Sequence, residues 1–252
     1  MLNISNRISI NTISGYGDGF SDLYSVLLDG TDEYINIDGV QTALAATTTG
    51  TWSAWVKPVD ATPVQTEVII SFAETAGDDD LMLYITTSGK LTALARLAGG
   101  VRWILETDAI AFSDNTWTHI AVVQDAVSPI LYVDGVAVDQ TFTTSTNKTY
   151  WFSTLPNINN GRIGDRIRNG GAEELHFNGN IDDVLFTSDA KSLAQIQNIY
   201  NNGKPKNEAT ISNGVSYFKF DGDVVSTCTD SIGSNNGTYV NVEQADIELD
   251  TP

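Results

Sequence analysis

Short apolar runs separated by turn residues dominate the chain from Tyr24 onwards. Gly, Asp, Asn or Pro stands between most of these runs, which include YSVLLDG, EYINI, TWSAWVKP, EVIISFAE, LMLYITTSG, KLTALARL and VRWILET. Within TWSAWVKP, the residues Trp52, Ala54 and Val56 fall on one face of a strand, and the residues between them fall on the other. Many strand-length runs joined by short turns predict an all-β sandwich or jelly roll.

The clearest local signal lies in residues 117–138, which read WTHIAVVQDAVSPILYVDGVAV. Asp134-Gly135 stands between two apolar runs, and Asp-Gly favours a tight hairpin because both turn positions need a positive φ. The segment therefore predicts three consecutive antiparallel strands, namely Trp117–Gln124, Ile130–Val133 and Val136–Phe142.

One helix is expected, over Ser192–Tyr200. Ser192 and Gln195 have the spacing of a capping box, and Gly203 with Pro205 ends the helix. One face of this helix is apolar and predicts that it lies on the sandwich as a lid; it carries Leu193, Ile196, Ile199 and Tyr200.

The two ends of the chain differ from its middle in their content of apolar and polar residues. Residues 1–21 are polar and contain too few apolar residues to build a core, so we expect an N-terminal arm that docks on a neighbouring subunit. Residues 22–203 form the predicted sandwich. Residues 204–252 form a C-terminal extension, with one strand in VSYFKFDGD and a tail rich in Gly, Asn and Ser. This extension either completes the sandwich with an edge strand or begins a second module.

The excess of acidic residues limits the classes of partner that the chain is expected to bind. The 252 residues include 13 Lys and Arg against 32 Asp and Glu, which gives a net charge of −19. Such a surface repels nucleic acid and anionic membranes. Solubility is the plainest meaning of this charge, and cation binding is compatible with it. A hydrophobic content of 41% is enough for a full core.

Cysteine and long apolar runs are scarce. The single cysteine, Cys228, allows neither an internal disulfide nor a cysteine zinc site. The N-terminal residues lack the apolar segment of a signal peptide, and no run approaches the ~18 residues of a membrane span. We therefore expect a chain without membrane insertion that is made in the cytoplasm and leaves it only as part of a larger assembly.

Four segments in a fixed order carry a family resemblance. They are VLLDGTDEYINI, GTWSAWVKP, NTWTHIAVVQD…ILYVDGVAV and FNGNIDDVLFTSDAKSLAQIQNIY, at residues 26–37, 50–58, 115–138 and 177–200. Over roughly residues 22–202 the chain resembles the laminin-G-like or concanavalin A-like lectin–glucanase superfamily, in the form found in bacterial surface proteins and phage structural proteins. The resemblance implies two antiparallel sheets in a jelly-roll sandwich. Members bind sugars or proteins, and some are glycosidases or lyases, so the fold leaves the function open.

Catalytic acids of the family's glycosidases are not matched. Retaining glycosidases need two carboxylates about 5 Å apart, and the family's enzymes carry them as Glu-x-Asp-x-(x)-Glu on one strand. Here Glu106 and Asp108 are followed by Ala-Ile-Ala, without the third acid. Glu173 and Glu174 are adjacent and would point to opposite faces of a strand. We therefore expect no catalytic site, and His119 is expected to be a structural residue of its strand.

A structural Ca²⁺ is the cofactor that the resemblance implies. In the family the ion often lies between the LDG loop and the strand with the G-x-IDD motif, and the matching residues here are Asp29, Asp32, Asp182 and Asp183. In a regular strand Asp182 and Asp183 would point to opposite faces, so only one of them could reach that loop. The alternative is that Asp29 simply forms the turn before Gly30.

Aromatic residues in polar loops are the candidates for ligand or partner contact. Tyr150, Trp151 and Phe152 are adjacent in a polar segment, and three adjacent rings are not expected to face one core. With Trp103, they form the expected contact surface. The alternative for any single aromatic ring is that it packs in the core, which is the more common position.

The leading functional hypothesis is a non-enzymatic structural or adhesive protein of a phage virion. It would be a capsid decoration, head-fibre or tail-associated subunit that is homo-oligomeric and contacts other subunits through the arm. This hypothesis depends on the missing signal peptide and on a C-terminal tail, NGTYVNVE…DIELDTP, that resembles phage-encoded members. The first alternative is a Ca²⁺-assisted carbohydrate-binding module that recognises host surface glycans, and the second is a polysaccharide-degrading enzyme.

Overall fold

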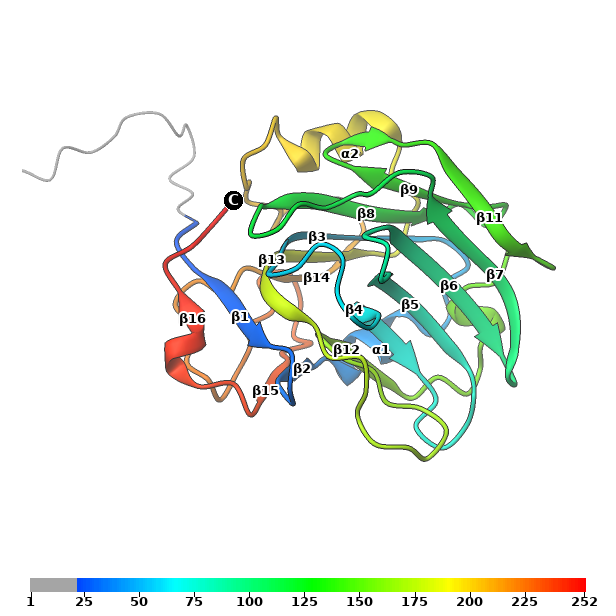
Figure 1. Cartoon of the computed structure of the whole chain (residues 1–252), viewed down its shortest axis with the longest axis horizontal. Helices are drawn as coiled ribbons and strands as arrows, with labels where there is room; N and C mark the ends of the chain where they lie inside the picture. The colour runs from blue at the N-terminus through cyan, green and yellow to red at the C-terminus, as the bar shows by residue number, and fades with distance from the viewer. Residues whose placement is uncertain (1–21) are drawn as a thin grey trace, which may run out of the picture.

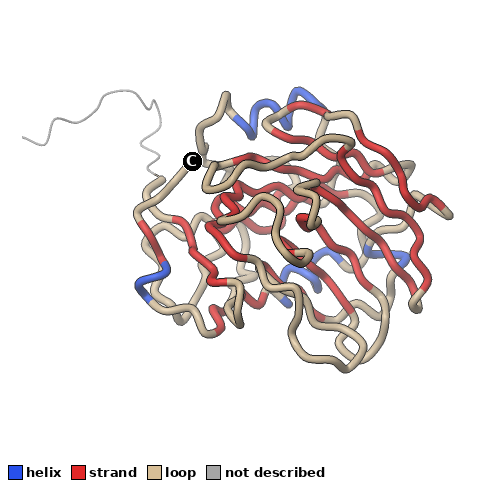
Figure 2. The backbone as a smooth tube through the Cα atoms, in the orientation of Figure 1, coloured by secondary structure: helices blue, strands red, loops and turns tan. Residues whose placement is uncertain are grey.

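Two antiparallel sheets packed face to face form the framework of residues 22–252, which are the residues that the computed structural model describes (Figures 1 and 2). The arm expected at residues 1–21 lies outside them. Sheet A runs in the order β10 (Val136–Ala137), β9 (Pro129–Val133), β8 (Thr118–Gln124), β3 (Gly50–Pro58), β13 (Asn178–Thr187), β1 (Ser25–Asp29) and β16 (Ile247–Glu248), and β14 (Gly214–Phe218) also pairs with β13.

Sheet B forms the opposite layer of the sandwich. Its order is β11 (Gln140–Ser145), β7 (Gly100–Thr107), β6 (Leu91–Leu97), β5 (Asp80–Ile85), β4 (Glu67–Ala73), β12 (Asn160–Ile163), β2 (Tyr34–Asn36) and β15 (Thr238–Val240). The described residues also form two α-helices, α1 (Asp38–Leu44) and α2 (Leu193–Tyr200). The predicted two-sheet sandwich is confirmed, and α1 was not expected. Neither helix is long and apolar enough to cross a membrane.

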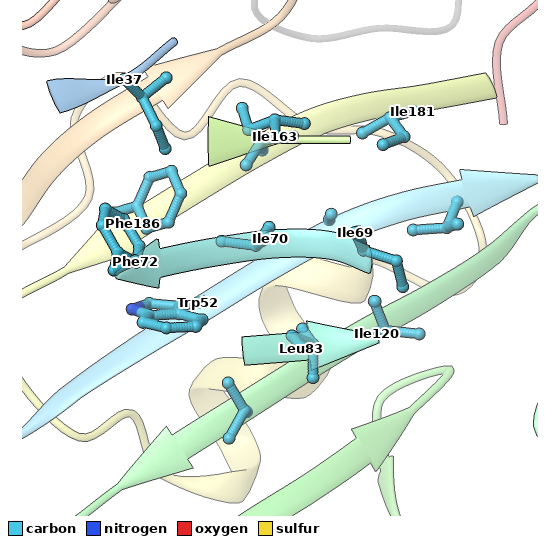
Figure 3. Close-up of a cluster of buried hydrophobic side chains, with 14 of the residues drawn as sticks. Ile37, Trp52, Ile69, Ile70, Phe72, Leu83, Ile120, Ile163, Ile181 and Phe186 are labelled. Carbon is cyan, nitrogen blue, oxygen red and sulfur yellow. The ribbon is translucent and has the colours of Figure 1, made fainter. Parts of the chain in front are cut away.

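The core lies between the sheets and follows the alternation read from the sequence. Figure 3 shows side chains of both sheets meeting there, with the labelled set Ile37, Trp52, Ile69, Ile70, Phe72, Leu83, Ile120, Ile163, Ile181 and Phe186. Trp52, Ala54 and Val56 all belong to this core, as the period-2 pattern of β3 predicted. The Trp52 and Phe72 rings, from opposite sheets, lie 5.0 Å apart between centroids.

The hairpin predicted at Asp134-Gly135 is present. These residues have φ values of 49° and 73°, which suit the turn between β9 and β10. The third predicted strand, Val136–Phe142, is divided, because the chain leaves sheet A after Ala137 and joins the edge of sheet B at Gln140. A continuous apolar pattern did not reveal this change of sheet.

Helix α2 covers the outer face of sheet A (Figure 1). A second apolar cluster fills the space beneath it and consists of Ala121, Val123, Tyr132, Leu185, Ile196, Ile199 and Tyr217. The predicted lid is therefore confirmed, although Leu193 is exposed rather than buried. The predicted capping box is also present, since the Ser192 side chain accepts from the Gln195 N–H and the Gln195 side chain accepts from the Ser192 N–H.

Replacing the cap of α2 should have a modest effect on stability. Ser192→Ala is expected to lower the free energy of unfolding by about 1 kcal/mol, because it removes the acceptor for a helix N–H. Urea denaturation measures this as a lower midpoint with an unchanged slope. Gln197→Ala, an exposed change in the same helix, is the control and should leave the midpoint nearly unaltered. Equal midpoints for both variants would contradict the role of the cap.

The outer face of sheet B is covered only in part. A loop over residues 164–177 folds onto it, with reciprocal backbone hydrogen bonds between Arg166 and Glu174. Leu175 of this loop packs against a small apolar cluster of Val68, Met82 and Leu94. Beyond the loop, outward side chains of β5, β6 and β7 remain partly exposed, including Tyr84, Arg96, Ile104 and Glu106. We call this uncovered part of sheet B the open face.

The C-terminal extension completes the sandwich. β14 pairs with β13, β15 with β2 and β16 with β1, so the segment contributes strands to both sheets. The side chains that it adds to the main core include Phe218, Phe220, Tyr239 and Ile247. Residues 204–252 therefore belong to the same domain as residues 22–203, and the alternative of a second module is wrong.

Candidate functional site

Three carboxylates converge where β13 passes the beginning of β1. One oxygen each of Asp22, Asp182 and Asp183 lies within 4.8 Å of the others. The two neighbouring aspartates reach the same place because β13 is irregular between Asp182 and Leu185, and Asp183 has a φ of 47°. This left-handed conformation is costly for an aspartate, and it turns Asp183 towards its neighbour rather than to the opposite face. We call Asp22, Asp182, Asp183 and the adjoining Asp221 the carboxylate cluster.

Burial and mutual repulsion disfavour negative charge in this cluster. Burial, followed by the nearby carboxylates, raises the pKa of Asp182 and of Asp183 well above the usual range. Burial and then Asp221 raise the pKa of Asp22 to about 7. The groups around the cluster therefore do not fully compensate the negative charge of its carboxylates when they are ionised.

The groups around the cluster orient it and neutralise only part of it. Asp221 Oδ1 accepts hydrogen bonds from the backbone N–H groups of Leu23 and Tyr24 at 2.8 and 3.1 Å. The Tyr217 hydroxyl contacts Asp183 Oδ1. Lys219 Nζ lies 3.6 Å from Asp221 Oδ2 and lowers the pKa of Asp22. These contacts tie the beginning of β1 to the residues after β14, and β14 to the middle of β13.

The donor set fits a hard divalent cation. Both carboxylate oxygens of Asp22, Oδ2 of Asp182 and Oδ2 of Asp221 are buried and have no hydrogen-bond partner. Ca²⁺ binds oxygen ligands at about 2.3–2.6 Å, so two oxygens on one ion lie no more than about 5 Å apart. The spacing and the unpartnered oxygens thus suit Ca²⁺, with carboxylates as ligands.

The structure brings together two of the four aspartates expected to bind calcium and places the other two elsewhere. Asp182 and Asp183 lie together, but Asp29 and Asp32 are exposed at the far end of β1. Asp29 pairs with Asn178 in the sheet, about 13 Å along β13 from Asp182 at 3.3 Å per residue. Its carboxylate accepts from the Thr31 N–H at 2.7 Å, which is the turn-forming role. Asp22 was missed, although antiparallel pairing of the first strand with β13 would bring its start beside Asp182.

The expected aromatic contact surface is not formed. Trp103, Trp151 and Phe152 are each only 1% exposed and belong to the core. The prediction was wrong because a 3₁₀ turn at Phe152–Thr154 lets both adjacent rings reach Trp52, at centroid distances of 4.8 and 6.0 Å. Tyr150 alone keeps part of its surface exposed.

The acids considered for catalysis lie in ion pairs with basic side chains. Glu106 contacts Lys90 at 2.8 Å, and Glu173 and Glu174 contact arginines at 3.3 and 2.7 Å. Asp108 lies in an exposed turn beyond the end of β7. His119 is buried against the Trp55 ring, and burial lowers its pKa to about 3, so it stays neutral as a structural residue.

The arginines of the described residues gather on sheet B. They lie on β6, β7 and β12 and on the loop after β12, as Arg96, Arg102, Arg162, Arg166 and Arg168. Buried Asp80 holds a network of them, with Arg166 at 3.1 Å, Arg96 at 3.3 Å and Arg168 Nε at 3.4 Å. Burial raises the pKa of Asp80, and the three guanidinium groups oppose that shift. The network fixes charged and polar groups beside the open face.

Several solved structures with a similar fold are carbohydrate-binding modules or sialidases. The CBM40 module of a Ruminococcus gnavus intramolecular trans-sialidase, bound to α2,3-sialyllactose, matches with a TM-score of 0.59 and 17% identity, over 72% of this chain and all of the module. A Bacteroides ovatus protein assigned provisionally to carbohydrate binding matches with a TM-score of 0.58 and 17% identity, over 92% of this chain and 63% of that protein. The NanB sialidase of Streptococcus pneumoniae matches with a TM-score of 0.59 and 18% identity, over 70% of this chain and 27% of the enzyme.

These likenesses, at such low identity, concern the fold. A search of curated protein sequences finds no match. The family model described as the concanavalin A-like lectin/glucanases superfamily, Laminin_G_3, matches residues 29–197, which is well over half of the chain. The chain belongs to the concanavalin A-like lectin/glucanase superfamily.

Proposed function

We propose that the chain is a non-catalytic carbohydrate-binding module whose ligand binds on the open face of sheet B. The observation that carries this proposal is the concentration of arginines and their carboxylate partners on that sheet. The outer face of sheet A packs against α2, whereas side chains of β5, β6 and β7 on sheet B remain partly exposed. The carbohydrate-binding modules that share the fold support carbohydrate binding as the function.

The open face has the chemistry that sugars require. Sugar hydroxyls are recognised by donors and acceptors held in fixed positions, with a ring to contact the C–H groups. Tyr84, Arg96 and Glu106 supply these groups from the neighbouring strands β5, β6 and β7, and Lys90 supplies a further donor just before β6. Burial, and then Glu106, raises the pKa of Tyr84 to about 12, so its hydroxyl keeps its proton and serves as a donor.

Ca²⁺ has a structural part in this proposal. The carboxylate cluster belongs to sheet A and to the chain ends beside it, whereas the ligand is assigned to sheet B. An ion bound by Asp22, Asp182 and Asp183 would neutralise the cluster and hold β1 and β13 together. It would stabilise the sandwich without contacting the sugar.

A glycan array tests the proposed function. The chain should bind a subset of oligosaccharides, and Tyr84→Ala should weaken that binding at least about fivefold, since a ring and a donor are lost. Asn198→Ala, an exposed change on α2 over the opposite sheet, is the matched control and should bind like the parent. Failure to bind any glycan would overturn the proposal. Cleavage of a bound polysaccharide that is lost in Glu106→Gln would instead support an enzyme.

The virion hypothesis stays a prediction. A phage structural or adhesive role, assembly into homo-oligomers and contact with other virion subunits through residues 1–21 need evidence from particles. Mass spectrometry of purified virions tests them directly. A carbohydrate-binding module in a virion would satisfy both hypotheses, because host surface glycans are a common target of adhesion.

A further inference from the structure

Two cations at the β7–β11 edge of sheet B have no acidic partner among the described residues. Most lysines and arginines of these residues form ion pairs, and besides the exposed Lys204 only Arg102 and Lys148 form none. This is unusual in a chain with a net charge of −19, where a cation has many carboxylates available. Each of the two instead lies over an aromatic ring.

The geometry around these cations is well defined. The guanidinium carbon of Arg102 lies 5.2 Å from the centre of the Tyr150 ring, and Lys148 Nζ lies 3.8 Å from the centre of the Phe142 ring. Both are cation–π distances. We call Arg102, Lys148, Tyr150 and Phe142 the cationic patch.

Hydrogen bonds fix the loop that carries half of this patch. Asn147 N–H donates to the Arg102 carbonyl at 3.0 Å, which places Lys148 near the beginning of β7. Gln124 Nε2 donates to the carbonyls of Lys148 and Tyr150 at 2.9 and 3.3 Å, and Trp103 Nε1 donates to the Tyr150 carbonyl at 3.1 Å. The patch is therefore preorganised and loses little conformational freedom when it binds a ligand.

An anionic group is the ligand that this arrangement favours. An arginine stacked on a ring keeps the N–H groups at its edge available, and its planar fork matches the two oxygens of a carboxylate. Arg102 Nε is buried without a hydrogen-bond partner. Arg102 lies at the bulge where the register of β7 with β6 shifts, and Phe142 of β11 pairs with Leu105 of β7. The patch therefore lies at the β7–β11 edge of sheet B, next to the strand that carries Ile104 and Glu106 of the open face.

We propose that the cationic patch binds the carboxylate of an acidic sugar and so gives the open face a preference for acidic glycans. This inference rests on the proposed carbohydrate-binding function and names the class of sugar. Arg102 would make the bidentate contact, and Lys148 would add a second charge to the same anion.

Calorimetric titration with matched oligosaccharides tests this proposal. 3′-Sialyllactose and lactose differ by one carboxylated sugar, and a glucuronic acid disaccharide with its glucose counterpart forms a second pair. The parent chain should bind the acidic member of at least one pair more tightly. Arg102→Gln should reduce that preference roughly 10- to 100-fold, as expected for a lost hydrogen-bonded charge contact, while binding of the neutral member stays the same.

A charge-matched variant separates the contact from general electrostatics. Lys204→Gln removes one positive charge from an exposed position after α2 and should keep the acidic preference. Unfolding temperatures of both variants should stay close to the parent, which shows that the fold is kept. Equal losses in Arg102→Gln and Lys204→Gln would overturn the inference.

The remaining outcomes distinguish the inference from the function on which it rests. Equal binding of acidic and neutral members, or an unchanged preference in Arg102→Gln, would refute the cationic patch and leave carbohydrate binding intact. Binding of no oligosaccharide would overturn both. If lactose 3′-sulfate binds as tightly as 3′-sialyllactose and Arg102→Lys keeps both affinities, the patch recognises charge alone and the carboxylate assignment is wrong.

Discussion

A chain that ends at Asn213 and lacks Gly214–Pro252 is expected not to fold. The deletion removes β14, β15 and β16, so that β13, β2 and β1 each lose one strand partner. It also removes a set of buried side chains, namely Tyr217, Phe218, Phe220, Tyr239, Val242 and Ile247. Burial of such side chains contributes about 1.5–3 kcal/mol each. Their sum is comparable with the whole free energy of unfolding of a domain, which is about 5–15 kcal/mol.

Circular dichroism and thermal denaturation measure this result. The truncated chain should lack near-ultraviolet signal from ordered aromatic rings and should show no cooperative transition. Leu249→Ala is the control within the same segment, because that side chain is 76% exposed, and its transition should match the parent. A truncated chain with an unchanged transition would mean that the extension is no part of the core.

Much of the fold was predictable because local patterns agree with the final structure. The alternation of β3 and the Asp134-Gly135 turn each specify a strand or a turn, and the structure contains both. The capping box of α2 is likewise a local signal. The divided strand after Val136 was not predictable, because the move from sheet A to sheet B depends on the partners that each half finds. The same holds for α1, a short helix that begins without a side-chain cap.

The candidate sites were harder to predict because each depends on a local irregularity. Asp182 and Asp183 share a cluster only because the bulge in β13 turns Asp183 back, and regular alternation predicts the opposite. Trp151 and Phe152 enter the core because a 3₁₀ turn follows them. The arginine positions on sheet B are visible in the sequence, but their common face requires the strand order. Sequence patterns therefore predict regular strands better than the places where strands bend.

Addition of Ca²⁺ is expected to raise the unfolding temperature of the chain by about 5–10 °C. At a concentration one hundred times the dissociation constant, a ligand that binds only the folded state adds about 2.7 kcal/mol. For a domain of this size, each kcal/mol shifts the midpoint by about 2–4 °C. The physical reason is the carboxylate cluster, whose negative charges repel one another and in which both oxygens of Asp22 and one oxygen each of Asp182 and Asp221 have no hydrogen-bond donor. Differential scanning calorimetry with CaCl₂ and with a chelator measures the shift.

Substitutions in the cluster should reverse the order of stabilities between the two conditions. Asp22→Asn removes a negative charge whose burial raises the pKa of the group to about 7, so in chelator at pH 8 this variant should unfold at a higher temperature than the parent. In CaCl₂ it should unfold at a lower temperature, because one ligand is lost. Asp182→Asn should likewise lose the rise caused by Ca²⁺.

Asp29→Asn and Asp32→Asn are the matched controls, since they change the aspartates that the sequence pattern assigned to the ion. Both side chains are exposed at the other end of β1, and both variants should keep the full rise with Ca²⁺. If they lose it while Asp22→Asn and Asp182→Asn keep it, the ion binds at the LDG loop and the carboxylate cluster is not its site. If CaCl₂ and chelator give the same unfolding temperature for the parent, Lys219 suffices to neutralise the cluster, and calcium has no structural part in this sandwich.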